Sequence, residues 1–275
     1  MNAKKSPKSP SNPAAENQLG IQSLETGLRL LEAFIGLEPS PMLKTIATRA
    51  GMHPAKAHRY LVSFCRSGFV ERDGDAGRYR LSHLALRLGL TAMNGLDPVR
   101  LGGPLVARLR DDLHHSVVLS VWGSSGVVSV RAENVEAPVA LTAKAGSVLA
   151  LLSTAAGRVF GAWLPRADTS SFVSSELALA ARTRNPDLPR TPAEVDALFA
   201  EVRKRGCARV SGLQRPDVNS MATPVFDHAG RITAAISVLG STRSLNIEWN
   251  GEVAQELKAT ATEMSKALGF VPPSK

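Results

Sequence analysis

Residues 51–72, GMHPAKAHRYLVSFCRSGFVER, join a tight turn to an amphipathic helix that also carries several cations. Gly51 predicts the turn, because glycine adopts positive φ without a steric cost. Pro54 suits the first turn of the helix that follows. The apolar face of this predicted helix is formed by Ala57, Tyr60, Leu61 and Phe64. Its cations belong either to an ordinary solvated surface or to a site that meets an anionic partner.

Positive charge gathers around this stretch. The chain of 275 residues has a net charge of +9, and twelve cations against seven acids give residues 1–81 a net charge of +5. Within them, residues 42–72 hold six lysines and arginines against Glu71 as their single acid. A local basic patch of this kind is typical of proteins whose partner is rich in phosphate.

The segments on either side predict a complete small domain over residues 19–81. A helix begins near Ile21, with Ser23 as its cap and with an apolar stripe at helical spacing, which consists of Leu24, Leu28, Leu31 and Ile35. A shorter helix covers about 42–50. Two β segments, 69–72 and 78–81, follow the cationic helix and are joined by the turn sequence DGDAG. This order is that of a winged helix-turn-helix, a DNA-binding module.

The rest of the chain indicates a tail, a connecting helix and a second domain. Residues 1–18 are rich in Ser, Pro and Lys, which favours a disordered basic tail. Residues 82–96 predict a linker helix. The second domain, 97–275, alternates apolar β runs with helical segments, which predicts an α+β fold with a largely antiparallel sheet. The predicted strands are 117–122, 127–132, 139–142, 208–210, 221–226 and 232–239, and the predicted helices are 98–113, 153–163, 169–182, 192–205 and 248–268.

Other classes of protein find little support in the residues. Cys65 and Cys207 are the two cysteines, far apart and outside any CxxC motif, so neither a disulfide scaffold nor a zinc site is expected. No secretory leader or membrane-spanning run is present, and a cytoplasmic location follows. Common catalytic and nucleotide-binding motifs are missing, and no cofactor is implied. Cys207 as a nucleophile is the enzymatic alternative, although a free thiol on a strand is more often a core residue.

Three long segments then resemble one known family. IQSLETGLRLLEAF, LKTIATRAGMHPAKAHRYLVSFCRSGFVER and GRYRLSHLALRLG resemble the DNA-binding half of IclR-type transcriptional regulators. GSVLALLSTAAGRVFGAWLP and MATPVFDHAGRITAAISVLG resemble the effector-binding half of the same family, which has a GAF-like fold. The resemblance implies a ligand-responsive regulator, a repressor or an activator, that binds a pseudo-palindromic DNA operator as a homodimer or as a dimer of dimers.

The resemblance also implies sites for both partners. Base contacts fall on Ala55, Lys56 and Arg59, and phosphate contacts on Lys44, His58, Arg78 and Arg80. An effector, a small organic and possibly aromatic acid, is expected between the start of the 153–163 helix and the sheet. Its expected contacts are Ala155, Ala156, Gly157, Asp217, Asn219, Met221, Ser237 and Leu239. Backbone N–H groups at that helix start suit a carboxylate, although a plain capped helix explains the same residues.

The chain departs from the family pattern at four of its positions. Ala55 and Lys56 replace the usual Ser or Thr, so the operator sequence is expected to differ. Leu213 stands where a glutamate is often found, and Asp217 replaces a usual glycine. A ligand-independent architectural DNA-binding protein is the second alternative, but it leaves the domain of residues 97–275 without a role.

Overall fold

A computed structural model describes residues 20–74, 77–95, 97–135, 144–181 and 187–272. The chain divides into two compact units, Met1–Gly95 and Leu96–Lys275. The predicted tail of residues 1–18 and the predicted strand at 139–142 lie outside the described residues. No helix in the described ranges is both long and apolar enough to cross a membrane.

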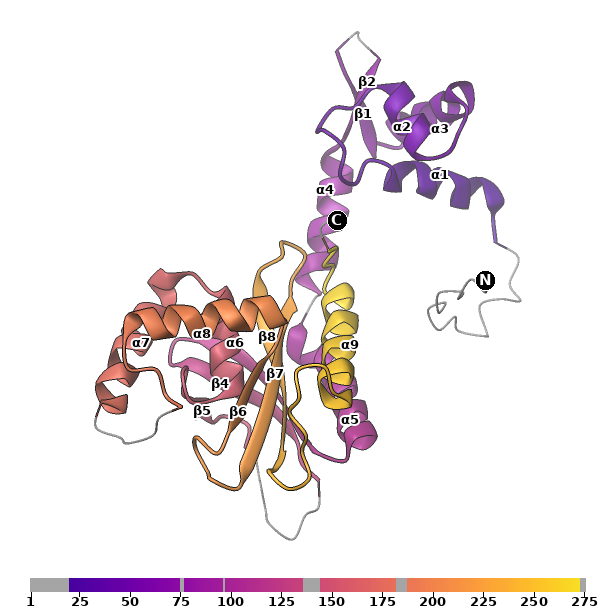
Figure 1. The fold of residues 1–275 in the computed structure, drawn as a ribbon. Helices are drawn as coiled ribbons and strands as arrows, with labels where there is room; N and C mark the ends of the chain where they lie inside the picture. The colour runs from indigo at the N-terminus through magenta and orange to yellow at the C-terminus, as the bar shows by residue number, and fades with distance from the viewer. Residues whose placement is uncertain (1–19, 75–76, 96, 136–143, 182–186, 273–275) are drawn as a thin grey trace, which may run out of the picture. The chain divides into compact units, whose positions relative to one another are not determined.

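The first unit is a three-helix core with a β hairpin (Figure 1). Its elements are α1 Gln22–Glu32, α2 Leu43–Arg49, α3 Pro54–Arg66, β1 Val70–Asp73, β2 Arg78–Leu81 and α4 His83–Asn94. Fully buried side chains from four of them, Leu30, Ile46, Leu61 and Tyr79, meet in one cluster. β1 and β2 pair antiparallel with Val70 opposite Leu81. The winged helix-turn-helix order predicted from the sequence is therefore present.

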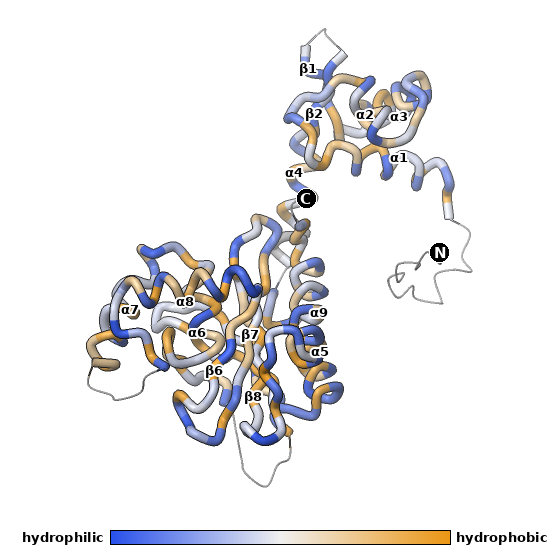
Figure 2. The backbone as a smooth tube through the Cα atoms, viewed as in Figure 1, coloured by the Kyte–Doolittle hydropathy of each residue, from blue (hydrophilic) through white to orange (hydrophobic). Residues whose placement is uncertain are grey.

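The start and the packing of α1 differ from the sequence prediction. Ile21, not Ser23, is the N-cap residue, and no side chain caps the helix. Leu24 and Leu28 of the predicted apolar stripe are 55% and 48% exposed, whereas Leu30 is fully buried. In Figure 2 the tube of α1 alternates between hydrophobic and hydrophilic colours. The helix has two apolar stripes, and helical spacing alone does not show which of them faces the core.

The turn before α3 forms as the sequence predicts. Gly51 has a φ of +64°, a conformation that costs other residues a steric penalty. His53 is the N-cap residue of α3, and its Nδ1 accepts a hydrogen bond from the backbone N–H of Ala55 at 3.3 Å. Ala57 and Leu61 are fully buried on the inner face. The outer face of α3 is thus fixed by the packing of its inner face.

The second unit is an α+β domain with a six-stranded sheet (Figure 1). The strand order is β5-β4-β3-β8-β7-β6, and the neighbouring strands pair antiparallel. The strands are β3 Ser116–Gly123, β4 Gly126–Glu133, β5 Val148–Leu149, β6 Ala208–Ser211, β7 Val218–Phe226 and β8 Ile232–Ser241. The helices are α5 Pro98–Leu113, α6 Ala155–Trp163, α7 Arg166–Ala180, α8 Pro192–Arg205 and α9 Glu252–Ala267. β5 is the one described strand that the sequence analysis missed.

Helices cover both faces of this sheet. α5 and α9 pack on one face, where Leu109 and Met264 join a cluster that includes Met221. α6 packs on the other face and α8 packs against α6, and Phe160 and Phe199 of these helices join a cluster that includes Ala222. Side chains along a strand alternate between the two faces of a sheet. The face on which a β7 residue lies is therefore decided by its parity along the strand.

Candidate functional site

The outer face of α3 presents unpaired cations. The side chains of Ala55, Lys56 and Arg59 are exposed on α3, and that of Lys44 is exposed on α2. Within the described ranges, no hydrogen bond or ion pair involves the side chain of any of these three cations. Small and cationic side chains on the exposed face of the second helix of a helix-turn-helix suit close approach to the DNA major groove.

His58 lies at the edge of this face and contacts the hairpin. Its Nε2 is 3.3 Å from a terminal nitrogen of Arg72. The guanidinium carbon of Arg72 in turn lies 5.9 Å from the ring centroid of the buried Tyr79. His58 therefore connects α3 to the hairpin through Arg72, and its predicted phosphate contact gains no support from this arrangement.

Both hairpin arginines with a predicted phosphate contact already have anionic partners. Arg78 Nη1 is 3.0 Å from Glu38 Oε1 and also donates to the backbone oxygen of Ser40 at 2.6 Å. Arg80 Nε is 2.8 Å from Glu71 Oε1. Because Arg78 is bonded at two points, it ties the hairpin to the segment before α2. Arg80 is more exposed and has a single partner, so it is the freer of the two to turn toward a phosphate.

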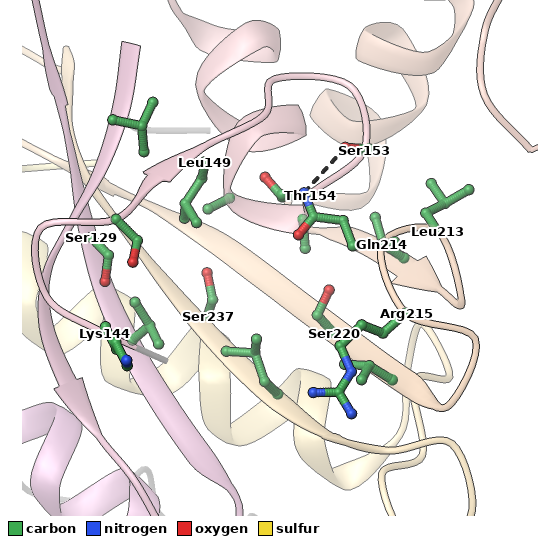
Figure 3. Close-up of a pocket in the computed structure, with 18 residues that line it drawn as sticks. Ser129, Lys144, Leu149, Ser153, Thr154, Leu213, Gln214, Arg215, Ser220 and Ser237 are labelled. Carbon is green, nitrogen blue, oxygen red and sulfur yellow. Dashed lines mark hydrogen bonds between the residues drawn. The ribbon is translucent and has the colours of Figure 1, made fainter. Parts of the chain in front are cut away.

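The second unit contains a cavity of about 370 Å³ between α6 and the sheet (Figure 3). The strands β3, β4, β7 and β8 form its floor, and the segment before α6 and the turn between β6 and β7 form its walls. Its lining consists of Val118, Ser129, Lys144, Ser147, Val148, Leu149, Ser153, Thr154, Ala155, Ala156, Val210, Leu213, Gln214, Arg215, Val218, Ser220, Ser237 and Leu239. Two cations and no acid are among these residues, so the cavity favours an anion.

The predicted effector contacts divide into two groups. Ala155, Ala156, Ser237 and Leu239 line the cavity, as does Leu213. Gly157 does not line it, and its backbone N–H donates to Thr154 Oγ1 at 2.9 Å. The predicted use of this N–H for an effector carboxylate is corrected accordingly, because the helix cap already occupies it.

Asp217, Asn219 and Met221 also lie outside the cavity lining. Met221 is fully buried against α5 and α9, on the opposite face of the sheet. Asn219 Nδ2 donates to the backbone oxygen of Leu245 at 2.9 Å, and Asp217 is an exposed partner of Arg215 at 3.3 Å. The sequence analysis began β7 at Met221, whereas the strand begins at Val218.

The alternation along β7 explains this correction. Val218 and Ser220 face the cavity, and the odd-numbered Asn219 and Met221 face away from it. A choice of register that is wrong by one residue moves every side chain to the other face of the sheet. The β7 residues that line the cavity are therefore Val218 and Ser220.

The start of α6 is held in place by a carboxylate. Glu176 of α7 accepts hydrogen bonds from the backbone N–H groups of Leu151 and Leu152 at 2.5 and 2.8 Å. Gly157 packs directly on the backbone of Ala150 and Leu151, where a Cβ atom does not fit. These contacts fix the wall of the cavity that precedes α6.

The buried Arg158 also stabilises this wall of the cavity through hydrogen bonds to backbone oxygens. It is 8% exposed and donates to the backbone oxygens of Leu152 at 2.8 Å and Arg209 at 3.0 Å. Burial lowers the pKa of its guanidinium to about 10, so Arg158 remains a cation at neutral pH. It joins the segment before α6 to β6.

The sequence analysis missed most of the polar residues of the cavity, notably Ser129, Lys144, Gln214, Arg215 and Ser220. They come from segments far apart along the chain, so no local spacing connects them. The described residues contain no group of side chains suited to a metal ion. Cys207 is fully buried in the cluster with α5 and α9, and burial raises the pKa of its thiol, which is unlike a nucleophile.

Comparisons with known proteins agree for both units. The family model "Bacterial transcriptional regulator IclR C-terminal" matches residues 91–266, and the model "IclR helix-turn-helix domain" matches residues 23–74. The crystal structure of Pseudomonas aeruginosa HmgR is 34% identical with a TM-score of 0.83, over 91% of this chain and 99% of that one. The DNA-binding transcriptional repressor YiaJ of Escherichia coli K12 is 27% identical, over 93% of this chain and 90% of YiaJ.

A more distant solved structure contains a ligand. An IclR homolog from Microbacterium hydrocarbonoxydans, complexed with 4-hydroxybenzoate, has a TM-score of 0.54 and 21% identity, over 89% of this chain and 98% of that one. At this identity the likeness concerns the fold. The relatives are regulators and not enzymes, so the interpretation of this chain as a non-enzyme is confirmed.

Proposed function

Because the chain belongs to the IclR family of DNA-binding transcriptional regulators, we propose that it binds a pseudo-palindromic operator as a homodimer and that a small organic acid in the cavity controls this binding. For the effector, the observation that carries the proposal is the cavity lining, which holds Lys144 and Arg215 but no acidic residue. A repressor and an activator both fit this mechanism. We further propose a cytoplasmic location, because DNA is the partner that the family binds.

The proposed DNA contacts follow from which cations are free. Lys56 and Arg59 are exposed on α3 without a partner among the described residues and are assigned to the major groove. Lys44 at the start of α2 is assigned to a phosphate. Arg80 is assigned a weaker phosphate contact, because it must give up part of its ion pair with Glu71. Arg78 is a structural residue in this proposal.

A second copy of the chain is the proposed cover for the apolar surface of the first unit. Nine of the twelve exposed large apolar side chains among the described residues lie between positions 21 and 90. They include Leu24 and Leu28 of α1 with Ile21 as the N-cap residue of that helix, and Leu86, Leu88 and Leu90 of α4. Exposed apolar patches of this kind mark interaction surfaces. Pairing two DNA-binding units through α1 and α4 gives the twofold symmetry that a pseudo-palindromic operator matches.

Effector control requires that the ligand prefers one arrangement of the paired DNA-binding units. The coupling between two such sites is commonly about 1–3 kcal/mol, or roughly 5- to 150-fold in affinity. The helix α4 joins the first unit to the second along the chain, so we assign it as the linker that carries the coupling.

Fluorescence anisotropy with the DNA upstream of the protein's own gene tests both parts. Operator binding is expected at nanomolar concentration, with a change of at least about fivefold when a binding organic acid is added. Thermal shifts against a panel of organic acids identify the acid first. Specific DNA binding that no bound acid alters would support the ligand-independent architectural alternative instead.

A further inference from the structure

Serine hydroxyls form a row across the floor of the cavity. Ser129 of β4, Ser237 of β8 and Ser220 of β7 all line it (Figure 3). Ser120 of β3 lies directly opposite Ser129 in the antiparallel register. Four neighbouring strands therefore each contribute one serine to the same face of the sheet, a face that is otherwise apolar beneath α6.

Three of these hydroxyls lack a protein partner. Ser120, Ser129 and Ser237 are 0%, 1% and 5% exposed, and their Oγ atoms make no hydrogen bond within the described part of the chain. A buried polar group that stays unsatisfied costs about 1–3 kcal/mol. Native proteins keep few such groups, and each of them calls for an explanation. Two of the three, Ser129 and Ser237, line the cavity, so a molecule inside it can satisfy both.

The rim of the cavity carries positive charge, whereas its floor carries neutral hydroxyl groups. Lys144 and Arg215 line it and are exposed. Arg215 shares its charge with Asp217 at 3.3 Å, whereas the side chain of Lys144 makes no hydrogen bond or ion pair within the described ranges. Much of the remaining lining is apolar, through Val118, Leu149, Leu213, Val218 and Leu239.

We propose that the effector is a hydroxylated organic acid with an apolar body, whose carboxylate is held at the rim by Lys144 and Arg215 and whose hydroxyl bonds to Ser129 and Ser237 at the floor. This inference rests on the proposed function of the cavity as an effector site. A volume of about 370 Å³ lies near the lower end of small-ligand pockets, which span roughly 300–1,000 Å³. A single aromatic ring with both substituents suits that size.

The serines act in this proposal as specificity-determining residues. A site built to bond a ligand hydroxyl discriminates against the analogue that lacks it, because the buried polar groups of the site are then left unpaired. Here a preference of at least about tenfold is expected, which corresponds to about 1.4 kcal/mol. Lys144 raises the affinity for all of these acids by a similar factor, since its attraction to the carboxylate is independent of the hydroxyl.

The test uses matched pairs of acids on the full-length protein. Isothermal titration calorimetry measures benzoate against its 2-, 3- and 4-hydroxy derivatives, and phenylacetate against the corresponding hydroxyphenylacetates. At least one hydroxylated acid is expected to bind about tenfold or more tightly than its parent. Ser237→Ala and Ser129→Ala should each reduce this preference while the parent acid keeps its affinity. Lys144→Gln should weaken every acid by a similar factor and leave the preference intact.

Ser211→Ala is the matched control, because Ser211 is an exposed strand serine on β6 outside the cavity lining. It should change neither affinity nor preference. The melting temperature of unliganded Ser237→Ala should not fall, since the variant loses a hydroxyl that has no protein partner. A large fall in that temperature would show that the serine serves packing and would count against the proposal.

The outcomes separate this inference from the proposed function. Equal affinity for parent and hydroxylated acids, a preference that survives in both serine variants, or no binding of either series at millimolar concentration overturns the inference. Effector control by another class of ligand would stand in each of these cases. Conversely, a hydroxyl preference without any change in operator affinity supports the ligand chemistry and contradicts the proposed regulation.

Discussion

Gln214 Nε2 donates a hydrogen bond to Ser153 Oγ at 3.3 Å, and this bond joins two walls of the cavity (Figure 3). Gln214 lies in the turn between β6 and β7, and Ser153 lies in the segment before α6. The two segments are about sixty residues apart along the chain, yet both line the same cavity. A ligand that enters or leaves between them has to pass this contact or break it.

Replacing Gln214 by Ala should therefore speed ligand release. A neutral hydrogen bond contributes about 0.5–1.5 kcal/mol, and an exposed one contributes near the lower limit, so we expect dissociation to be two- to fivefold faster with little change in melting temperature. Stopped-flow measurement with the acid that the panel identifies gives the rate. Gln255→Ala is the control, since Gln255 of α9 donates a similar exposed hydrogen bond to the backbone oxygen of Asn250, and neither residue lines the cavity. Equal release rates in the two variants would show that the contact does not gate the cavity.

Removing a free cation of α3 should weaken operator binding. Arg59→Ala and Lys56→Ala are each expected to lower affinity by about five- to a hundredfold if the side chain reads a base, and to reduce the slope of affinity against salt by about one unit if it contacts a phosphate. Anisotropy titrations at several salt concentrations distinguish the two roles. Lys204→Ala removes the same charge from an exposed position on α8 of the other unit, and it should leave the salt slope unchanged. An affinity for operator that stays constant in both α3 variants would contradict the assignment.

Placing a charge in the exposed apolar surface of the first unit should disrupt the dimer. Leu28→Glu on α1 and Leu88→Glu on α4 replace side chains that are 48% and 49% exposed, so the isolated unit should keep its fold. Formation of the dimer would bury the new carboxylate in apolar surroundings without a partner, which costs several kcal/mol. Analytical ultracentrifugation should show dissociation, and operator affinity should fall with it. Leu179→Glu on α7, at a position 62% exposed, is the control. Unchanged mass in both test variants would place the dimer contact elsewhere.

Loss of the Glu176 carboxylate should loosen the wall of the cavity. Glu176→Gln leaves an amide oxygen to accept from Leu151 N or Leu152 N, but it removes the charge from both bonds. Hydrogen bonds to charged groups contribute about 1.5–3 kcal/mol, against about 1 kcal/mol for neutral ones, so we expect a loss of stability of about 1–3 kcal/mol. Hydrogen exchange at the amides of Leu151 and Leu152 should accelerate. Exchange at wild-type rates in this variant would rule out the carboxylate as the support of that segment.

Local residue patterns were sufficient for the turn before α3 and for the inner face of that helix. Gly51, Pro54 and the spacing of Ala57 and Leu61 predict the turn and the inner face of α3, because all of these are separated by a few residues. The family resemblance was likewise carried by contiguous segments and is confirmed. Local patterns did not predict the ion pairs of the hairpin arginines. Glu38 lies forty residues before Arg78, and no helical or strand periodicity relates the two.

The cavity between α6 and the sheet depended on the tertiary structure. Whether Ser220 or Met221 faces it follows from which face of β7 packs beneath α6, and neighbouring residues along a strand lie on opposite faces. Lys144, Gln214 and Arg215 meet there because the sheet and the segment before α6 bring separate parts of the chain together. The sequence by itself determined the order of the elements and the family. Folding decided which stripe of α1 is buried and which serines lie beneath α6, because both depend on packing partners distant along the chain.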